Sequence, residues 1–337
     1  MQQHSQYIFC SKSVSTTLSL PVLAAGTDDA HDRIQIDRVH QTCPDQLDWS
    51  HHWRDGAEVV LSLARHGADY WLRFPGLADF LLQPHSLRVV VAGDTSTDPN
   101  TLEHLLVDQV LPRLLAHLGS LMVHASAVQI GEHHALFIGP SGRGKSTLAA
   151  LLKRRGHSVL SDDCVQLRTG AQGCEALPTY PSLRLYADSL ENVFPGEKAT
   201  SPVARYSEKL RLALEAPAMG MKAFAVDAMY LLEDPLHSDI DVHIWPSPPS
   251  RTCQALLGHS FRLDLADRDG NAAHFARCAS VVNKVPTFGL VYPRDFSQSA
   301  KLVDTIAQHL STVTTDASQP RKACTATTTI PSTHMGP

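Results

Sequence analysis

Three patterns of apolar and polar residues follow one another in the first third of this chain of 337 residues. Residues 1–50 are polar without a regular period, whereas residues 57–93 contain short apolar runs, such as 87–91, that are typical of strands. Residues 101–118 then carry leucine and valine at helical spacing. We therefore expect an irregular segment over residues 1–50. A small α+β region should follow over residues 51–120, with a helix whose leucine stripe packs a sheet against the next domain.

A second group of apolar runs begins at residue 121 and predicts an α/β domain. Residues 121–130 and 135–138 are apolar and are separated by a polar turn, which predicts a β-hairpin. Residues 146–155 have a leucine stripe and basic residues in the last turn, and Gly156 follows as a left-handed cap, so this segment predicts a helix. Residues 157–160 predict another strand, which a right-handed crossover would place parallel to the strand at 135–138.

The turn between the predicted strand and helix holds the most specific motif of the chain. Residues 139–146 read GPSGRGKS and match the phosphate-binding loop G-x-x-x-x-G-K-[ST] at every defined position. Glycines let backbone N–H groups turn toward phosphates, the start of the helix adds the positive end of its dipole, and the lysine reaches the outer phosphates. We therefore predict a site for ATP and Mg²⁺, with Ser146 on the metal. The nucleotide-binding residues would be Gly139, Pro140, Ser141, Gly142, Arg143, Gly144, Lys145, Ser146 and Thr147.

Two acidic residues follow the strand predicted at residues 157–160. Asp162 and Asp163 would repel each other and a triphosphate unless a cation lies among them, so this doublet also indicates Mg²⁺. One carboxylate can bind the metal while the other orients a nucleophile. His124 lies in the apolar run upstream. If the hairpin pairs residues whose numbers sum to about 265, His124 faces Ser141 and contacts the loop.

These motifs resemble the HPr kinase/phosphorylase family, bacterial enzymes that phosphorylate a serine on a small carrier protein. The resemblance extends from His124 to Cys164-Val165. Between these residues lie the loop, whose lysine follows the histidine by 21 residues, then Arg155-Gly156-His157 and the acidic doublet. The resemblance implies an α/β, P-loop nucleotide-binding core of the HPr-kinase type.

The same resemblance implies roles for the motif residues. Lys145 would bind the β and γ phosphates, and Ser146 and Asp163 would hold Mg²⁺. Asp162 would accept the proton of the acceptor hydroxyl, with His124 nearby to tune it. A positioned carboxylate of this type contributes roughly a hundredfold to ten-thousandfold to the rate.

One segment departs from the family pattern. Members that also run the reverse reaction carry a Glu-Ile-Arg-Gly-like segment after the acidic doublet, whereas residues 178–186 here read PTYPSLRLY. We therefore expect a kinase without phosphorylase activity that transfers the γ-phosphate of ATP to a serine-type hydroxyl of a peptide or protein. The chain also resembles peptide-tailoring kinases of lasso peptide clusters. A small-molecule kinase and a non-catalytic nucleotide-dependent regulator remain alternatives. GTP or pyrophosphate as donor and a homo-oligomeric state, as in the family's rings of six, remain open.

A site for an anionic transfer reaction usually recruits a further cation, and Arg143, Arg184, Lys209 and Arg211 are the candidates near the motifs. Arg184 lies on a predicted apolar strand, where it either lines the acceptor cleft or extends to the surface. Residues 292–295 read YPRD and predict a turn after a buried strand.

Composition argues against several other classes. The net charge of −5 without a dominant basic face argues against nucleic-acid binding, and no apolar run approaches the ~20 residues of a membrane span. The run at 18–25 contains proline and is interpreted as structural, not as a secretory signal. Seven cysteines without a C-x-x-C pair favour a reduced, cytoplasmic protein without structural zinc. From residue 313 the chain is rich in Ser, Thr, Ala and Pro, so we expect the kinase domain over 121–312 and a disordered tail over 313–337.

Overall fold

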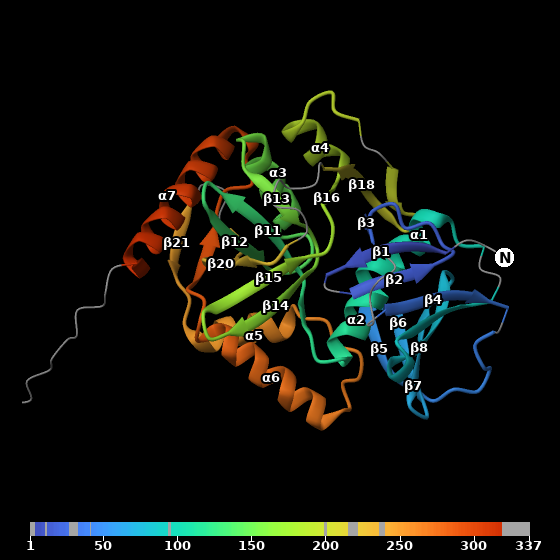
Figure 1. Ribbon diagram of the computed structural model, residues 1–337. Helices are drawn as coiled ribbons and strands as arrows, with labels where there is room; N and C mark the ends of the chain where they lie inside the picture. Colours follow the sequence, from blue (N-terminus) through green and yellow to red (C-terminus); the bar gives the residue numbers. More distant parts are fainter. Residues whose placement is uncertain are drawn as a thin grey trace, which may run out of the picture.

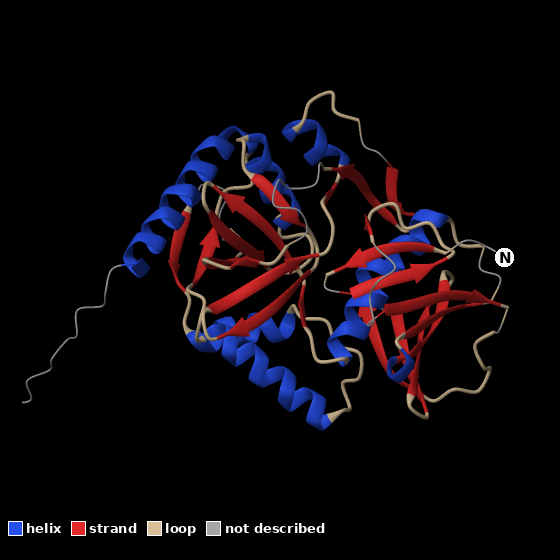
Figure 2. Cartoon of the chain, viewed as in Figure 1, coloured by secondary structure: helices blue, strands red, loops and turns tan. Residues whose placement is uncertain are grey.

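The chain folds as a mixed α/β protein with several sheets. Figure 1 shows an N-terminal sheet, in blue and cyan, beside a second part that holds the other sheets and the longest helices. Figure 2 shows that strands dominate the first part, whereas helices cover the outside of the second. The computed structural model describes residues 4–10, 12–26, 33–40, 42–93, 96–198, 201–214, 222–235 and 240–318.

The N-terminal sheet has nine strands in the order β3-β1-β2-β4-β9-β8-β7-β6-β5. The expectation of an irregular segment over residues 1–50 is wrong, because β1 to β4 lie within it and β5 begins there. In β4, Ile34 and Ile36 are buried while Arg33, Gln35 and Asp37 stay partly exposed, so the overall polarity of this segment hid a strand period of two. The strands are β1 (Ser5–Phe9), β2 (Lys12–Thr16), β3 (Ala24–Ala25), β4 (Arg33–Val39), β5 (Trp49–Asp55), β6 (Glu58–His66), β7 (Asp69–Phe74), β8 (Ala78–Gln83) and β9 (Arg88–Ala92).

The helix predicted over residues 101–118 is confirmed and contains a π-helical turn. It consists of α1 (Pro99–Leu105), the π-helical turn η2 (Leu106–Val110) and α2 (Leu111–His117), and the short 3-10 helix η1 (Pro84–Ser86) lies before it. The leucines of this helix are buried in one apolar core with strands of the N-terminal sheet. The same core contains Met122, Cys164 and Tyr180. The leucine stripe is therefore core, as predicted, and the core continues past residue 120.

A six-stranded sheet with the order β13-β11-β12-β20-β22-β21 forms the centre of the second part. The predicted hairpin is confirmed, but its paired residues sum to 263, so His124 lies at the level of residue 139 and not of Ser141. β13 runs in the direction of β12 as predicted, although β11 lies between them because both pair antiparallel with β11. The strands are β11 (Ala125–Ile130), β12 (His133–Ile138), β13 (Ser158–Ser161), β20 (Ala228–Leu232), β21 (His243–Pro246) and β22 (Thr287–Val291).

Helices cover both faces of this sheet. α3 (Lys145–Arg154) and α7 (Ser299–Ser318) share an apolar core with one face, while α5 (Pro249–Gly258) and α6 (Arg268–Val282) share another core with the opposite face. The predicted disordered tail is wrong for residues 313–318, because α7 continues to Ser318 on an amphipathic pattern. The remaining residues of that prediction lie outside the described part of the chain.

Two smaller sheets complete the fold. A four-stranded sheet has the order β10-β14-β15-β19, and a three-stranded sheet has the order β16-β18-β17. The three-stranded sheet lies between the helix α1–η2–α2 and the six-stranded sheet (Figure 1). The elements are β10 (Leu121–Val123), β14 (Val165–Gly170), β15 (Gly173–Pro178), β16 (Ser182–Leu185), β17 (Ser201–Ala204), β18 (Ser207–Ala213), β19 (Phe224–Ala225), the helix α4 (Ala187–Val193) and the 3-10 helix η3 (Phe296–Gln298).

Candidate functional site

The glycine-rich loop connects β12 directly to α3. Gly142 and Gly144 have φ angles of 79° and 86°, in the left-handed region that favours glycine. Lys145 begins α3 and is almost completely buried, and its Nζ donates to the carbonyl oxygens of Gly139, at 2.7 Å, and Pro140, at 3.1 Å. The lysine therefore folds back onto its own loop and holds the loop closed. Burial lowers the pKa of Lys145, and the charges of Asp163 and Asp162 oppose this shift.

Asp162 lies at the end of β13 and is fully buried. Its carboxylate accepts hydrogen bonds from the Ser126 hydroxyl, at 2.5 Å, and from the backbone N–H of Arg184, at 3.3 Å. Burial and then the charge of Asp163 raise the pKa of Asp162 to about 6, although Ser126, Arg184 and Ser146 act in the opposite direction. Asp162 is thus a buried acid that titrates close to neutral pH.

Asp163 has the opposite character, although it is the next residue. Its Oδ2 lies 3.0 Å from Arg184 Nε, and its φ of 69° is unusual for a residue with a side chain. The Ser161 hydroxyl fixes this turn by donating to the Cys164 carbonyl at 2.8 Å. Burial alone would raise the pKa of Asp163, but the positive charges around it, with Arg184 first, lower it well below its usual value. Asp163 therefore stays ionised beside an acid with a raised pKa.

His124 lies between β10 and β11 and packs against this turn. Its Nδ1 lies 2.6 Å from the Asp163 carbonyl oxygen, to which it can donate a hydrogen bond. Burial lowers the pKa of His124 to about 4, so the ring is neutral at pH 7. The 3.7 Å approach of its Nε2 to Asp163 Oδ1 is then no ion pair, and a neutral Nε2 presents a lone pair at this point.

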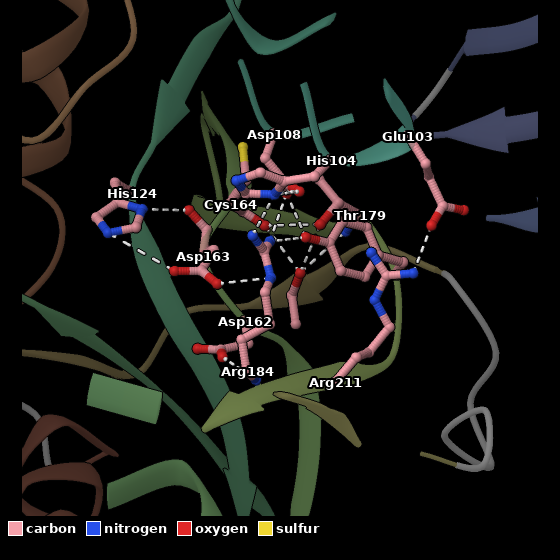
Figure 3. A network of polar contacts seen from close by, with 12 residues as sticks. Glu103, His104, Asp108, His124, Asp162, Asp163, Cys164, Thr179, Arg184 and Arg211 are labelled. Atoms are coloured by element: carbon pink, nitrogen blue, oxygen red, sulfur yellow. Dashed lines mark hydrogen bonds and ion pairs between the residues drawn. The ribbon is translucent and has the colours of Figure 1, made fainter. Parts of the chain in front are cut away.

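Arg184 connects the acidic doublet to the helix of the N-terminal part (Figure 3). It is buried on β16, and its Nη2 lies 2.5 Å from Asp108 Oδ1 in the π-helical turn η2 and also contacts the Tyr180 hydroxyl. His104 Nδ1 completes the cluster at 2.9 Å from Arg184 Nη1 and 2.8 Å from Asp108 Oδ2. Arg184 therefore lies between two carboxylates, and it does not extend to the surface.

A cavity of about 300 Å³ joins these parts. Its wall includes the loop residues 141–147, together with His124, Asp163 and Arg184. Gly139 and Pro140 are not on this wall, and their carbonyls accept hydrogen bonds from Lys145. Asp162 is not on the wall either, which sets it apart from Asp163. Sequence reasoning thus located the loop side of the cavity.

Another part of the cavity wall was only partly predicted. Tyr186, Lys209 and the segment at residues 292–296 belong to it; Lys209 was a candidate cation, whereas only a turn was predicted for residues 292–295. The signal was available in the topology: β12, β20 and β22 are parallel, so the segments after their carboxyl ends share one edge of the sheet. The contact is close, since a Cβ at Gly144 would lie 3.0 Å from the Tyr292 hydroxyl.

The residues present fit a magnesium ion. Ser146 and Asp163 line the same cavity, and Asp163 Oδ2 faces Arg184 Nε at 3.0 Å, so Oδ1 is the oxygen of this carboxylate that could serve a cation. Mg²⁺ commonly takes one or two carboxylates and completes its shell with water and phosphate oxygens. Such a site needs no dedicated cage, and the described residues contain no cluster of three or more His, Cys, Asp or Glu that could hold a metal alone.

Comparisons with known proteins show a distant structural similarity. No known protein family matches this chain, and no curated protein matches it. Among solved structures, the Hpr(Ser) kinase/phosphatase from Coxiella burnetii is similar over 57% of this chain and 98% of its own, with 11% sequence identity and a TM-score of 0.32. This similarity is too weak to transfer a function or a substrate. No helix in the described part of the chain is long and apolar enough to cross a membrane.

Proposed function

We propose that this chain is a Mg²⁺- and ATP-dependent kinase that transfers the γ-phosphoryl group to a serine-type hydroxyl of a peptide or protein. The arrangement of Lys145, Ser146 and Asp163 on one wall of the cavity, with Asp162 buried behind them, supports this proposal. Neighbouring carboxylates with opposite pKa shifts are typical of sites that separate a charge-stabilising role from a proton-transfer role.

The loop side of the cavity would bind the phosphates. Backbone N–H groups of residues 141–146 and the start of α3 favour an anion. Lys145 uses two of its N–H groups on loop carbonyls, which leaves one for a phosphate oxygen. Ser146 and Asp163 would hold Mg²⁺, which neutralises charge on the phosphates when it is bound.

Asp162 would accept the proton in the transfer step. The acceptor oxygen attacks the γ-phosphorus, the bond from this phosphorus to the β-γ bridging oxygen breaks, ADP leaves, and the acceptor proton passes to Asp162. A pKa of about 6 leaves Asp162 ionised at pH 7 and basic enough to take a proton late in the transfer. Because Asp162 is fully buried, the acceptor complex must open a path to it beside Ser146, whose hydroxyl lines the cavity.

A peptide or protein is proposed as acceptor because the described cavity has no arginine-rich lid. Two of the arginines on its wall, Arg143 and Arg294, both pair with Asp234. The rim is open and carries Tyr186, which is 45% exposed. Small-molecule kinases usually close a mobile lid over both substrates, so this rim fits a larger acceptor better. Absence of phosphorylase activity, a cytoplasmic location and a homo-oligomeric state belong to the same proposal.

The test is transfer of labelled γ-phosphate from Mg-ATP to peptides with an accessible serine. Wild type would be compared with Asp162→Asn and Lys145→Ala, with GTP and pyrophosphate as alternative donors. Label on a serine that both substitutions abolish is the expected result. If Mg-ATP binds but only a metabolite fraction is labelled, a small-molecule kinase is correct. Binding without any transfer would establish a nucleotide-dependent regulator instead.

A further inference from the structure

The proposed function leaves one electrostatic role unassigned. Phosphoryl transfer spreads negative charge over three oxygens, and Lys145 approaches these oxygens from the loop side only. A second cation on another part of the cavity wall would supply the remaining contact. The described wall of the cavity carries five basic residues, namely Arg143, Lys145, Arg184, Lys209 and Arg294.

Four of these five cations are already engaged within the protein. Arg143 and Arg294 pair with Asp234, Arg184 lies between Asp108 and Asp163, and Lys145 donates to loop carbonyls. Lys209 differs, because it makes no side-chain hydrogen bond or ion pair with another described residue. Its Nζ lies 5.5 Å from the centre of the Tyr186 ring, at the rim of the cavity.

The strand arrangement explains why Lys209 has no counter-ion among the described residues. Arg184 on β16 is the cross-strand partner of Arg211 on β18, and Lys209 lies two residues from Arg211, so all three side chains belong to one face of the small sheet. Arg184 is neutralised by Asp108, and Arg211 by Glu103, both from the helix α1–η2–α2. The described part of that helix supplies no third carboxylate to Lys209.

Lys209 acts electrostatically on the centre of the site. Its positive charge is among the causes that lower the pKa of Asp163 and of Lys145. Lys209, Asp163 and Lys145 also line the same cavity, where the outer phosphate of a bound nucleotide would lie. A lysine with an uncommitted charge and a flexible stem suits a contact that forms when a phosphate arrives.

The helix of the N-terminal part fixes the hairpin that carries Lys209. Arg211, two residues after it, pairs with the buried Glu103. On the other side, the N–H of Arg205 donates to the Thr101 hydroxyl at 2.7 Å. Both anchors are on α1, so the hairpin β17–β18 is attached to the N-terminal part on either side of Lys209.

We propose that Lys209 is the second cation of the transfer site and contacts the transferred phosphoryl group from the part of the cavity wall formed by β18. This inference rests on the proposed kinase function. The ammonium leaves the face of Tyr186 and approaches an equatorial oxygen of the group in transfer. Removing one preorganised donor of this kind costs about a hundredfold to a thousandfold in rate.

The experiment compares wild type with Lys209→Met and Lys209→Arg. Two kinds of quantity are measured. The first is binding affinity, for Mg-ADP and for Mg-ADP with aluminium fluoride, a mimic of the transferred phosphoryl group. The second is the rate of transfer to a serine peptide. Lys209→Met should leave Mg-ADP affinity unchanged, weaken binding of the mimic about a hundredfold and slow transfer by a similar factor. Lys209→Arg should recover most of both losses. Lys284→Ala, an exposed lysine outside the cavity, is the control and should change neither quantity.

The outcomes separate this inference from the kinase proposal. If the mimic binds wild type and Lys209→Met equally well, or if Mg-ADP loses as much affinity as the mimic, the role of Lys209 is wrong while the kinase can stand. If no serine peptide is labelled but mimic binding still depends on Lys209, the acceptor assignment fails and the cation remains supported. If wild type binds no magnesium nucleotide, both proposals fall.

Discussion

Replacing Asp162 by asparagine removes a buried charge and keeps the shape of the side chain. In the structure, Asp162 accepts from the Ser126 hydroxyl and from the N–H of Arg184. An asparagine can satisfy both partners: its oxygen accepts from Arg184 N–H, and its amide group donates to Ser126, whose hydroxyl can turn. The substitution therefore changes charge with little loss of hydrogen bonding.

The expected stability change follows from the pKa of Asp162, which rises from 3.8 to about 6 in the folded protein. Two pKa units at about 1.36 kcal/mol each amount to about 3 kcal/mol. Because the folded state holds the proton more tightly than the unfolded state, wild type loses this stability as pH rises from about 4 to about 6. The variant carries no such charge. Asp162→Asn should therefore be more stable than wild type at pH 7, by up to about 3 kcal/mol, and nearly equal to it below pH 4.

The assay is urea unfolding of both proteins at several pH values between 4 and 8, together with Mg-ATP affinity and phosphate transfer. Nucleotide binding should persist, while transfer should fall about a hundredfold to ten-thousandfold. Asp45→Asn, at an exposed position, is the control and should show no growing stability difference. A stability difference that does not grow with pH would refute the buried charge. Transfer at the wild-type rate would refute the role of Asp162 as proton acceptor.

Three further predictions address other parts of the site. Asp108→Ala should destabilise the protein by about 3–5 kcal/mol in urea unfolding, because it leaves Arg184 buried without this partner. The control, Asp304→Ala at an exposed ion pair, should cost less than about 1 kcal/mol. Equal losses of stability in the two variants would contradict the argument. Gly144→Ala and Gly131→Ala should each lower the free energy of unfolding by about 1–2 kcal/mol, because both positions have left-handed φ angles. Only Gly144→Ala, whose Cβ meets the Tyr292 hydroxyl, should also weaken nucleotide binding in titration calorimetry. The transfer efficiency kcat/KM should fall about tenfold per pH unit below about 6, where Asp162 takes up a proton, and a flat pH profile would argue against this role.

The part of the site that sequence reasoning located is local in the chain. The loop and the acidic doublet lie on adjacent elements, so their motifs and the hairpin upstream were readable from short patterns. The contact between Arg184 and Asp108 joins residues 76 positions apart, and no local pattern encodes it. The charge of Asp108 within the predicted helix of residues 101–118 was the one local sign that a buried partner exists. The roles of Asp162, Asp163 and His124 stay predictions, because geometry brings these residues together without showing what they do.

The N-terminal strands were missed for a different reason. Their alternation is between apolar and partly buried polar residues, as in β4, so average polarity concealed the period. The segment at residues 292–296 was underestimated because its place depends on the parallel order of β12, β20 and β22, which a single sequence does not reveal.

The apolar core that runs from the N-terminal sheet past residue 120 has a consequence for folding. Met122, Cys164 and Tyr180 share this core with the nine-stranded sheet, and the buried charges of Arg184 and Arg211 have their counter-ions on the N-terminal helix. A fragment that began at residue 121 would expose this apolar surface, and it would leave the buried Arg211 without Glu103 and the buried Arg184 without Asp108. The two halves of the chain are therefore interdependent in folding: the candidate site cannot reach its final geometry until the N-terminal helix has docked.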